Sequence, residues 1–478
     1  MFVVMALVTT VATTPLTKAL YPPWYQKKVE RWRRGEIDWD GNSTNPSEPG
    51  EGELQQKRPE SQIRRLMVHL RLDSLPSLFT FITLLSPEGV PVSSHPDAAE
   101  ASPNDSEVQI KKKPLEVHGL RVIELTDRTS SVMHLTEGED FYSQRDPVVN
   151  AFRTFSQLHD VAVSGRVAVV PADSYAETLM TQASEVSSDF ALIPWGEYGS
   201  ASEDLSFPVP MSASERFRSS IHLEFINQTL HKAARTCNTG IFIDNGFGGI
   251  AKPPVERLDL SRTKSAMSIR SFGNELASLP VANKSHHIFL PFLGGADDRV
   301  AIRLVLQLAK NQNVTASIVH IKWPTAPASA PADDSKTTVL SSQSTPDPKA
   351  ATPEGRQEQE NAVFFATMQA SLPADLSSRV VFSEADISAP ASALSEIVAL
   401  AQKTVGQRPK NAGDVVVLGR GNVRFADVLV AEGAGGASSS TPDLKRTVGA
   451  VAEQLVTIGV KASILVVQAG GKGLEVFA

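Results

Sequence analysis

Two glycine-containing turns carry the residue types best suited to holding an anion. The run Gly-Gly-Ala-Asp-Asp-Arg occupies positions 294–299 and Gly-Arg-Gly occupies positions 419–421, each directly after an apolar run typical of a buried strand. Ligands of doubly wound sheets bind beyond the carboxyl ends of the strands, where glycine turns present backbone N–H groups. A phosphate group is the expected ligand. The predicted ligand-binding residues are Gly294, Gly295, Asp297, Asp298, Arg299, Gly419, Arg420 and Gly421.

A second interpretation of the same turns needs no ligand. The glycines then serve turn geometry, Asp297 caps the following helix, and the acidic pair complements the helix dipole while Arg299 pairs with one of the two. The sequence contains neither a P-loop nor a complete dinucleotide-binding fingerprint. Both interpretations stay open. We expect no cofactor, with an adenine nucleotide as the alternative.

The remaining reactive side chains do not form a pattern that indicates catalysis. His286 and His287 have no third metal ligand at a useful spacing, and Cys237 is the only cysteine. A nucleophile elbow and a zinc-protease motif are both absent from the sequence. The net charge of -7 and the scattered basic residues give no footprint for nucleic acid. We therefore expect no enzyme, no catalytic residues, no metal site and no nucleic-acid partner.

The elements that would position the two turns alternate between strands and helices. Short apolar runs alternate with helical periodicity in two blocks of the same order, which indicates an internal duplication. We expect an α/β fold with two doubly wound, five-stranded parallel-sheet domains. The expected strands are 65–72, 117–125, 162–170, 190–195, 240–245, 287–293, 315–321, 379–382, 414–418 and 462–467. The expected helices are 74–85, 147–158, 174–184, 212–236, 297–310, 356–370, 390–403 and 443–457.

Stretches rich in Pro, Ser, Gly and charge set the expected domain limits. The first α/β domain spans 62–250, a linker follows at 251–285, and the second domain spans 286–478. Residues 323–355 form a disordered insertion in the second domain.

The amino-terminal stretch indicates a membrane helix. Residues 1–17 carry no charge and as a helix would extend roughly 26 Å, slightly less than a hydrocarbon core of about 30 Å. We therefore predict that residues 1–22 are the end of a last transmembrane helix that begins upstream. The basic juxtamembrane segment and linker, 23–61, opens with interleaved basic and aromatic residues, so the lipid contact runs through residues 1–34 and the chain beyond is cytosolic.

Two alternatives compete with a membrane span. A secretory signal peptide places its positive charge before the apolar run, whereas here the charge follows it. A buried helix of a soluble protein leaves the aromatic and basic flank without an explanation. The single cysteine also favours a reducing compartment.

Several of these segments together resemble one family. The membrane end from Met5 to Leu16, the strand Gly240-Ile241-Phe242-Ile243-Asp244 and the turn Phe292–Arg299 are similar to the carboxyl-terminal part of cation/proton exchangers of the CHX type, in the fungal potassium/proton antiporter branch. The Asp414–Gly421 ending and the final strand Ser463–Gln468 are similar too. The loop after Gly421 departs from the Gly-x-x-Gly and later Gly-Ser/Thr phosphate pattern of nucleotide-binding universal stress proteins.

The resemblance implies a cytosolic regulatory tail of a monovalent cation (K⁺ or Na⁺)/proton antiporter, built from tandem domains similar to universal stress proteins. The intact protein would be a multi-pass integral membrane protein, with the upstream transmembrane transport domain as partner and a homodimer as an option. Residues 1–17 contain no ionisable side chain, so the exchanging carboxylates would lie upstream of Met1. The alternative functions are an adenine-nucleotide sensor and a dimerisation module of the universal-stress-protein type.

Overall fold

The structure is a computed structural model, and it describes a defined part of the chain. The described residues are 62–86, 115–126, 143–159, 161–196, 215–248, 281, 283–323, 353–389, 392–408, 411–421 and 442–471. The predicted membrane helix end, 1–22, and the juxtamembrane segment, 23–61, lie outside these residues, as does most of the predicted insertion. None of the helices in the described ranges combines the length and the apolar character that a membrane crossing requires.

The first block of strands and helices ends at residue 248. Its strands are apolar runs, and its helices carry apolar residues on one face, as expected for a sheet covered on both sides. The strands are β1 (Arg65–His69), β2 (Glu116–Glu124), β3 (Ala162–Val170), β4 (Phe190–Pro194) and β5 (Asn238–Ile243). The helices are α3 (Leu75–Leu85), α6 (Pro147–His159), α7 (Tyr175–Glu185) and α8 (Ser220–Ala233), with short 3-10 turns at Leu72–Ser74, Ala172–Ser174 and Glu215–Phe217.

The second block repeats this order of elements. Its strands are β6 (His286–Phe292), β7 (Val314–Lys322), β8 (Val380–Asp386), β9 (Val415–Gly419) and β10 (Ser463–Gln468). Its helices are α9 (Ala296–Leu308), α10 (Pro353–Ala370), α11 (Ala374–Ser377), α12 (Ala393–Thr404), α14 (Pro442–Val448) and α15 (Ala450–Ile458).

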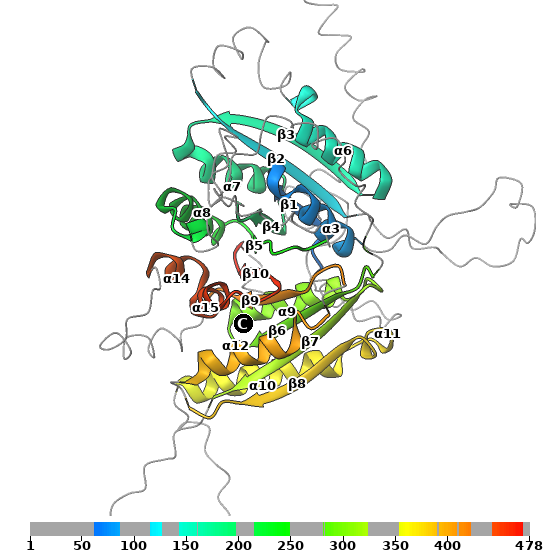
Figure 1. Cartoon of the computed structure of the whole chain (residues 1–478), viewed down its shortest axis with the longest axis vertical. Coiled ribbons are helices and arrows are strands. Elements are labelled where there is room, and N and C mark those ends of the chain that lie inside the picture. Colours follow the sequence, from blue (N-terminus) through cyan, green and yellow to red (C-terminus); the bar gives the residue numbers. More distant parts are fainter. Residues whose placement is uncertain are drawn as a thin grey trace, which may run out of the picture. The chain divides into compact units, whose positions relative to one another are not determined.

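The strands of both blocks form one sheet. Within the described residues the order is β3-β2-β1-β4-β5-β10-β9-β6-β7-β8, so each block contributes the same doubly wound arrangement (Figure 1). Neighbouring strands are parallel except β5 and β10, which pair antiparallel with Ile243 opposite Ile464. The expected α/β fold with five doubly wound strands per block is confirmed. The two sheets that we expected as separate units are continuous across the β5–β10 pair.

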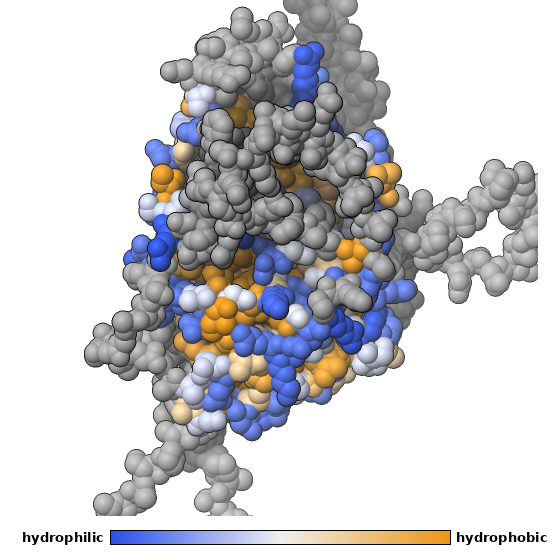
Figure 2. Space-filling model, in the orientation of Figure 1, coloured by the Kyte–Doolittle hydropathy of each residue, from blue (hydrophilic) through white to orange (hydrophobic). Residues whose placement is uncertain are grey.

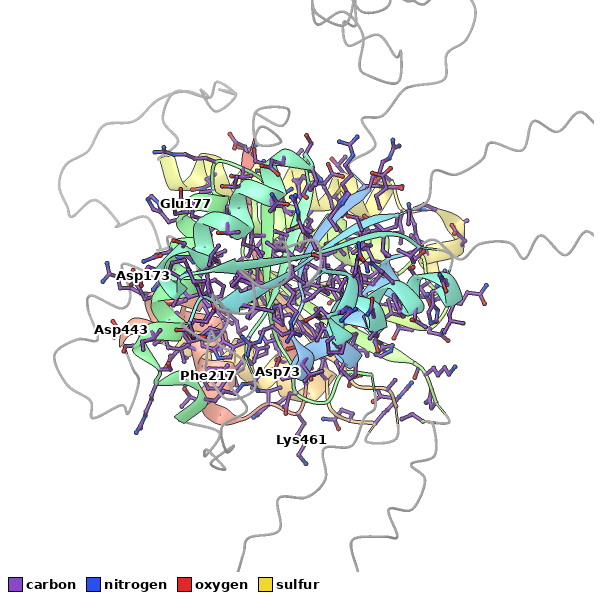
Figure 3. The ribbon with its side chains drawn as sticks, turned by 90° about the horizontal axis from the view of Figure 1, so that it is seen from above. Asp73, Asp173, Glu177, Phe217, Asp443 and Lys461 are labelled. Atoms are coloured by element: carbon purple, nitrogen blue, oxygen red, sulfur yellow. The ribbon has the colours of Figure 1, made fainter. Side chains whose placement is uncertain are left out.

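Helices cover both faces of this sheet and bury two apolar layers. One layer contains side chains of α3, α6, α9 and α10, and the other contains side chains of α7, α8, α12, α14 and α15. Successive residues of a strand alternate between the layers: Leu66 and Val68 face the first, and Met67 faces the second. Outside, Figure 2 shows hydrophobic residues interspersed with hydrophilic ones over the second block, and Figure 3 shows Lys461 pointing away from the ribbon.

Among the expected elements, three helices differ clearly from the structure. The helix predicted at 212–236 begins at Ser220, because the Ser219 hydroxyl caps it by accepting the N–H of His222 (3.4 Å). The helix predicted at 443–457 is two helices that meet at Gly449, whose φ of 90° interrupts the helical backbone. Helix α10 begins at Pro353, inside the predicted insertion 323–355.

Candidate functional site

The two predicted turns meet at the carboxyl ends of β6 and β9. These strands are parallel neighbours, with Ile288 opposite Val415. The Asp298 carboxylate accepts the backbone N–H of Gly419 (2.9 Å), and the Asp297 carboxylate accepts that of Gly421 (2.8 Å). The juxtaposition that the doubly wound order predicted is therefore present.

Four backbone N–H groups where the two turns meet are already bonded to carboxylates of the same chain. The second oxygen of Asp298 accepts the N–H of Leu293 (2.8 Å), and that of Asp297 accepts the N–H of Ala469 (2.7 Å). A Cβ on Gly419 would collide with the Asp298 carboxylate. The two aspartates thus occupy the position that a bound anion would need.

Burial sets the protonation behaviour of both aspartates. Asp298 is 3% exposed, and its burial raises the pKa to about 7, with the N–H bonds opposing this rise and the charge of Asp297 adding to it. Burial also raises the pKa of Asp297, while N–H bonds from Ala469 and Gly421 and the positive charge of Arg420 lower it. A carboxylate pair of this kind can take up a proton.

The two predicted arginines are held by protein groups. Arg420 donates from Nε to Thr447 O (2.8 Å) and from Nη1 to Gln468 Oε1 (2.6 Å), so it bonds the carboxyl end of α14 and the end of β10. Arg299 donates to Asn361 Oδ1 (3.3 Å) and lies over the ring of Phe364 (5.2 Å). The expected pairing of Arg299 with an aspartate was wrong, since Asn361 and Phe364 both lie on α10.

Gly294 and Gly295 provide the turn geometry that the second interpretation requires. Both have a positive φ, 98° and 99°, which favours glycine. Gly295 is the residue before α9, and Asp297 lies in the first turn of that helix. Asp297 was therefore wrongly predicted to cap α9, because its carboxylate reaches across to the loops after β9 and β10 instead.

A pocket of about 540 Å³ opens beside Arg420. It lies between α8 of the first block and α14 and α15 of the second, and its lining includes His231, Arg420, Lys445 and Arg446. The sequence contained no signal for this grouping, because it depends on the pairing of β5 with β10.

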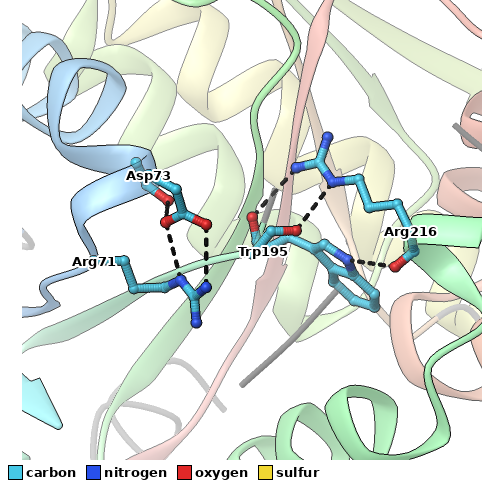
Figure 4. Close-up of polar contacts among 6 residues, drawn as sticks. Arg71, Asp73, Trp195 and Arg216 are labelled. Carbon is cyan, nitrogen blue, oxygen red and sulfur yellow. Dashed lines mark hydrogen bonds and ion pairs between the residues drawn. The ribbon is translucent and has the colours of Figure 1, made fainter. Parts of the chain in front are cut away.

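At the carboxyl ends of the first block's strands, two arginines bond to protein groups. Arg71 donates from Nε and Nη2 to the Asp73 carboxylate (both 3.1 Å), and Arg216 donates to the carbonyls of Gly196 and Asp244 (both 3.1 Å). Figure 4 shows the Arg71–Asp73 pair and Arg216 beside Trp195, whose indole N–H donates back to Arg216 O (3.4 Å). In both blocks, the arginines at the carboxyl ends of the strands are therefore bonded to groups of the protein itself.

Comparison with known proteins shows that part of this chain is similar to cation/proton antiporters. Residues 117–247, from β2 to the turn after β5, match a family model described as the plant cation/H(+) antiporter domain. The match lies within the first block.

Individual relatives agree with the family model. The chain is 24% identical over 327 residues to "Cation/H(+) antiporter 15" of Arabidopsis thaliana, covering 66% of this chain and 30% of the relative. It is 23% identical to "Cation/H(+) antiporter 18" of the same plant, covering 66% and 31%. The chain thus spans about a third of the length of these relatives. The predicted similarity to cation/proton antiporters is confirmed.

Among solved structures, the chain is similar to a universal stress protein from Archaeoglobus fulgidus. The TM-score is 0.37 at 10% identity, with 85% of this chain and 96% of that protein covered.

Proposed function

We propose that this chain is the cytosolic regulatory part of a monovalent cation/proton antiporter. The observation that carries the proposal is the similarity to cation/proton antiporters, which extends over 66% of the chain. The chain matches only 30% of the length of "Cation/H(+) antiporter 15", which leaves room for a separate transport domain in the intact protein. In this proposal the transported ion is K⁺ or Na⁺ and the intact protein belongs to the fungal branch of the family.

The site geometry supports a regulatory role better than nucleotide binding. Four backbone N–H groups of the glycine turns and their flanks are bonded to Asp297 and Asp298. A triphosphate would have to displace two carboxylates and would meet their negative charge, both of which cost free energy. In our proposal the carboxyl ends of these strands therefore hold α9, β6, β9 and β10 together and bind no nucleotide.

The sheet also supports pairing of the two blocks within one chain, in place of pairing between two chains. The fifth strands of the two blocks pair with each other, so this edge is satisfied within one chain. In our proposal the paired blocks form one regulatory unit, joined through residues 1–34 to the membrane and to the transport domain.

Complementation tests the proposal. The intact protein, including everything upstream of Met1, is expressed in yeast that lacks its own K⁺ and Na⁺ exchangers, and growth at high K⁺ or Na⁺ is measured. We expect growth with the intact protein and none with residues 1–478 alone, because exchange needs ionisable residues among membrane helices. A reporter after Ala478 should be cytosolic. Growth supported by residues 1–478 alone, or a lumenal reporter, would contradict the proposal.

A further inference from the structure

Asp298 lies at a contact point between three elements. Its own helix α9 holds it at the carboxyl end of β6, where Leu293 donates to it, and Gly419 at the end of β9 donates to its other oxygen. Asp297 extends the same arrangement to Gly421 and to Ala469 after β10. The acidic pair therefore bonds α9 to the ends of three neighbouring strands.

Burial and the charge of Asp297 favour proton uptake by Asp298, whereas the backbone N–H bonds to Asp298 and the charge of Arg420 beside Asp297 oppose it. From β6 and β9, backbone N–H groups face Asp298, and the charged side chain that acts on it is Asp297 of its own helix. Arg420, from the loop after β9, acts on Asp297. Burial and a second carboxylate nearby both raise the pKa of a carboxyl group, so that it binds a proton more readily.

The other end of α9 contacts the segment through which the chain enters the sheet. The Gln307 side chain accepts the N–H of Ile63 (2.8 Å) and donates to its carbonyl (2.9 Å), and both bonds are buried. Ile63 lies just before β1, at the start of the described residues. Helix α9, about 20 Å long, thus connects the acidic pair to the start of the first block.

We propose that Asp298, with Asp297 beside it, is a proton-binding site that couples pH to the attachment of α9. Protonation replaces charge-assisted hydrogen bonds to Gly419 and Leu293 by neutral ones, which are roughly half as strong. The loop 419–421 is then held less tightly, and α9 can shift against it. A role of this site in exchange rests on the proposed function, whereas proton binding is a property of the chain alone and is tested separately.

Infrared spectroscopy of the full chain tests the site directly. Aspartate is labelled with ¹³C at the carboxyl carbon, and the band of the protonated acid is followed from about pH 5 to about pH 9. We expect one band that persists well above the range of ordinary aspartates and titrates with a midpoint at about pH 7. It disappears in Asp298→Asn. It persists in Asp189→Asn, which removes an exposed aspartate that also accepts two backbone N–H groups.

Asp297→Asn supplies a result that does not depend on the folding of Asp298→Asn. It removes the negative charge that raises the pKa of Asp298, so the midpoint moves to lower pH. Hydrogen exchange at the Gly419 amide, corrected for intrinsic rates, should be slower above the midpoint than below it. The absence of a protonated acid band at pH 6 in the unmodified chain overturns the site, as does an unchanged midpoint in Asp297→Asn.

Discussion

Two histidines in the first block are buried among aromatic rings. His69 and His222 both contact Phe225, with ring centroids 5.8 and 6.0 Å apart, and His222 also meets Trp195 edge-on at 4.8 Å. Burial, and to a smaller extent the nearby Arg71, lowers the pKa of each imidazole to about 3. Both rings are therefore neutral in the folded chain at physiological pH.

This burial predicts acid sensitivity. The pKa of each histidine falls from 6.5 in the unfolded chain to about 3 in the folded chain. The free energy of unfolding is therefore unaffected by these histidines above pH 6.5 and decreases as the pH falls from 6.5 toward 3. At pH 5 the loss is about 2 kcal/mol for each histidine. Urea unfolding at pH 7.5 and pH 5 should show that His222→Phe makes the loss of unfolding free energy smaller by about 2 kcal/mol. His231→Gln, at an exposed position, is the control; an undiminished drop in His222→Phe contradicts the prediction.

At the same scale, the sequence predicted which residues of the second block would meet but not what they would bond. Strand order alone placed the turns at 294–299 and 419–421 together. Whether the turn amides face a ligand or a carboxylate depends on the rotation of α9, which brings Asp297 and Asp298 onto them. Residue types cannot specify that rotation.

At the scale of elements, α9 packs closely on the end of β9. A Cβ at position 419 would collide with Asp298, whereas one at position 421 would lie 3.0 Å from an Asp297 oxygen. Gly419→Ala should therefore destabilise the chain by about 1–3 kcal/mol, as overpacking does. Gly421→Ala, at an exposed position, should cost less. The midpoint of urea unfolding measures both, and equal losses would show that the contact does not constrain β9.

Most strands and helices were predictable because each strand is a short apolar run and each helix has a periodic apolar face. Strand β3 was predicted with its observed limits, Ala162–Val170. Some failures depend on contacts distant in sequence. Gly449, for example, interrupts a helical pattern where a Cβ would meet the carbonyl of Arg420.

At the scale of the molecule, the two blocks are joined by more than the β5–β10 pair. The Gln468 side chain donates to Leu230 O of α8 (2.8 Å), and Gly248 donates to Ala412 O (2.8 Å). The Asn245 N–H donates to the Ser463 hydroxyl (2.8 Å). These bonds join residues more than 150 positions apart, and no local pattern predicts them. They make the two blocks one unit.

Proton flux in membrane vesicles tests the central claim most directly. The intact protein is compared with a version that ends at residue 61, and the initial rate of proton movement on addition of K⁺ or Na⁺ is recorded over a range of pH. We predict that both proteins exchange cations for protons and that removal of residues 62–478 changes how the rate depends on pH. Identical rates and pH profiles for the two proteins, or no cation-dependent flux with the intact protein, would contradict the account.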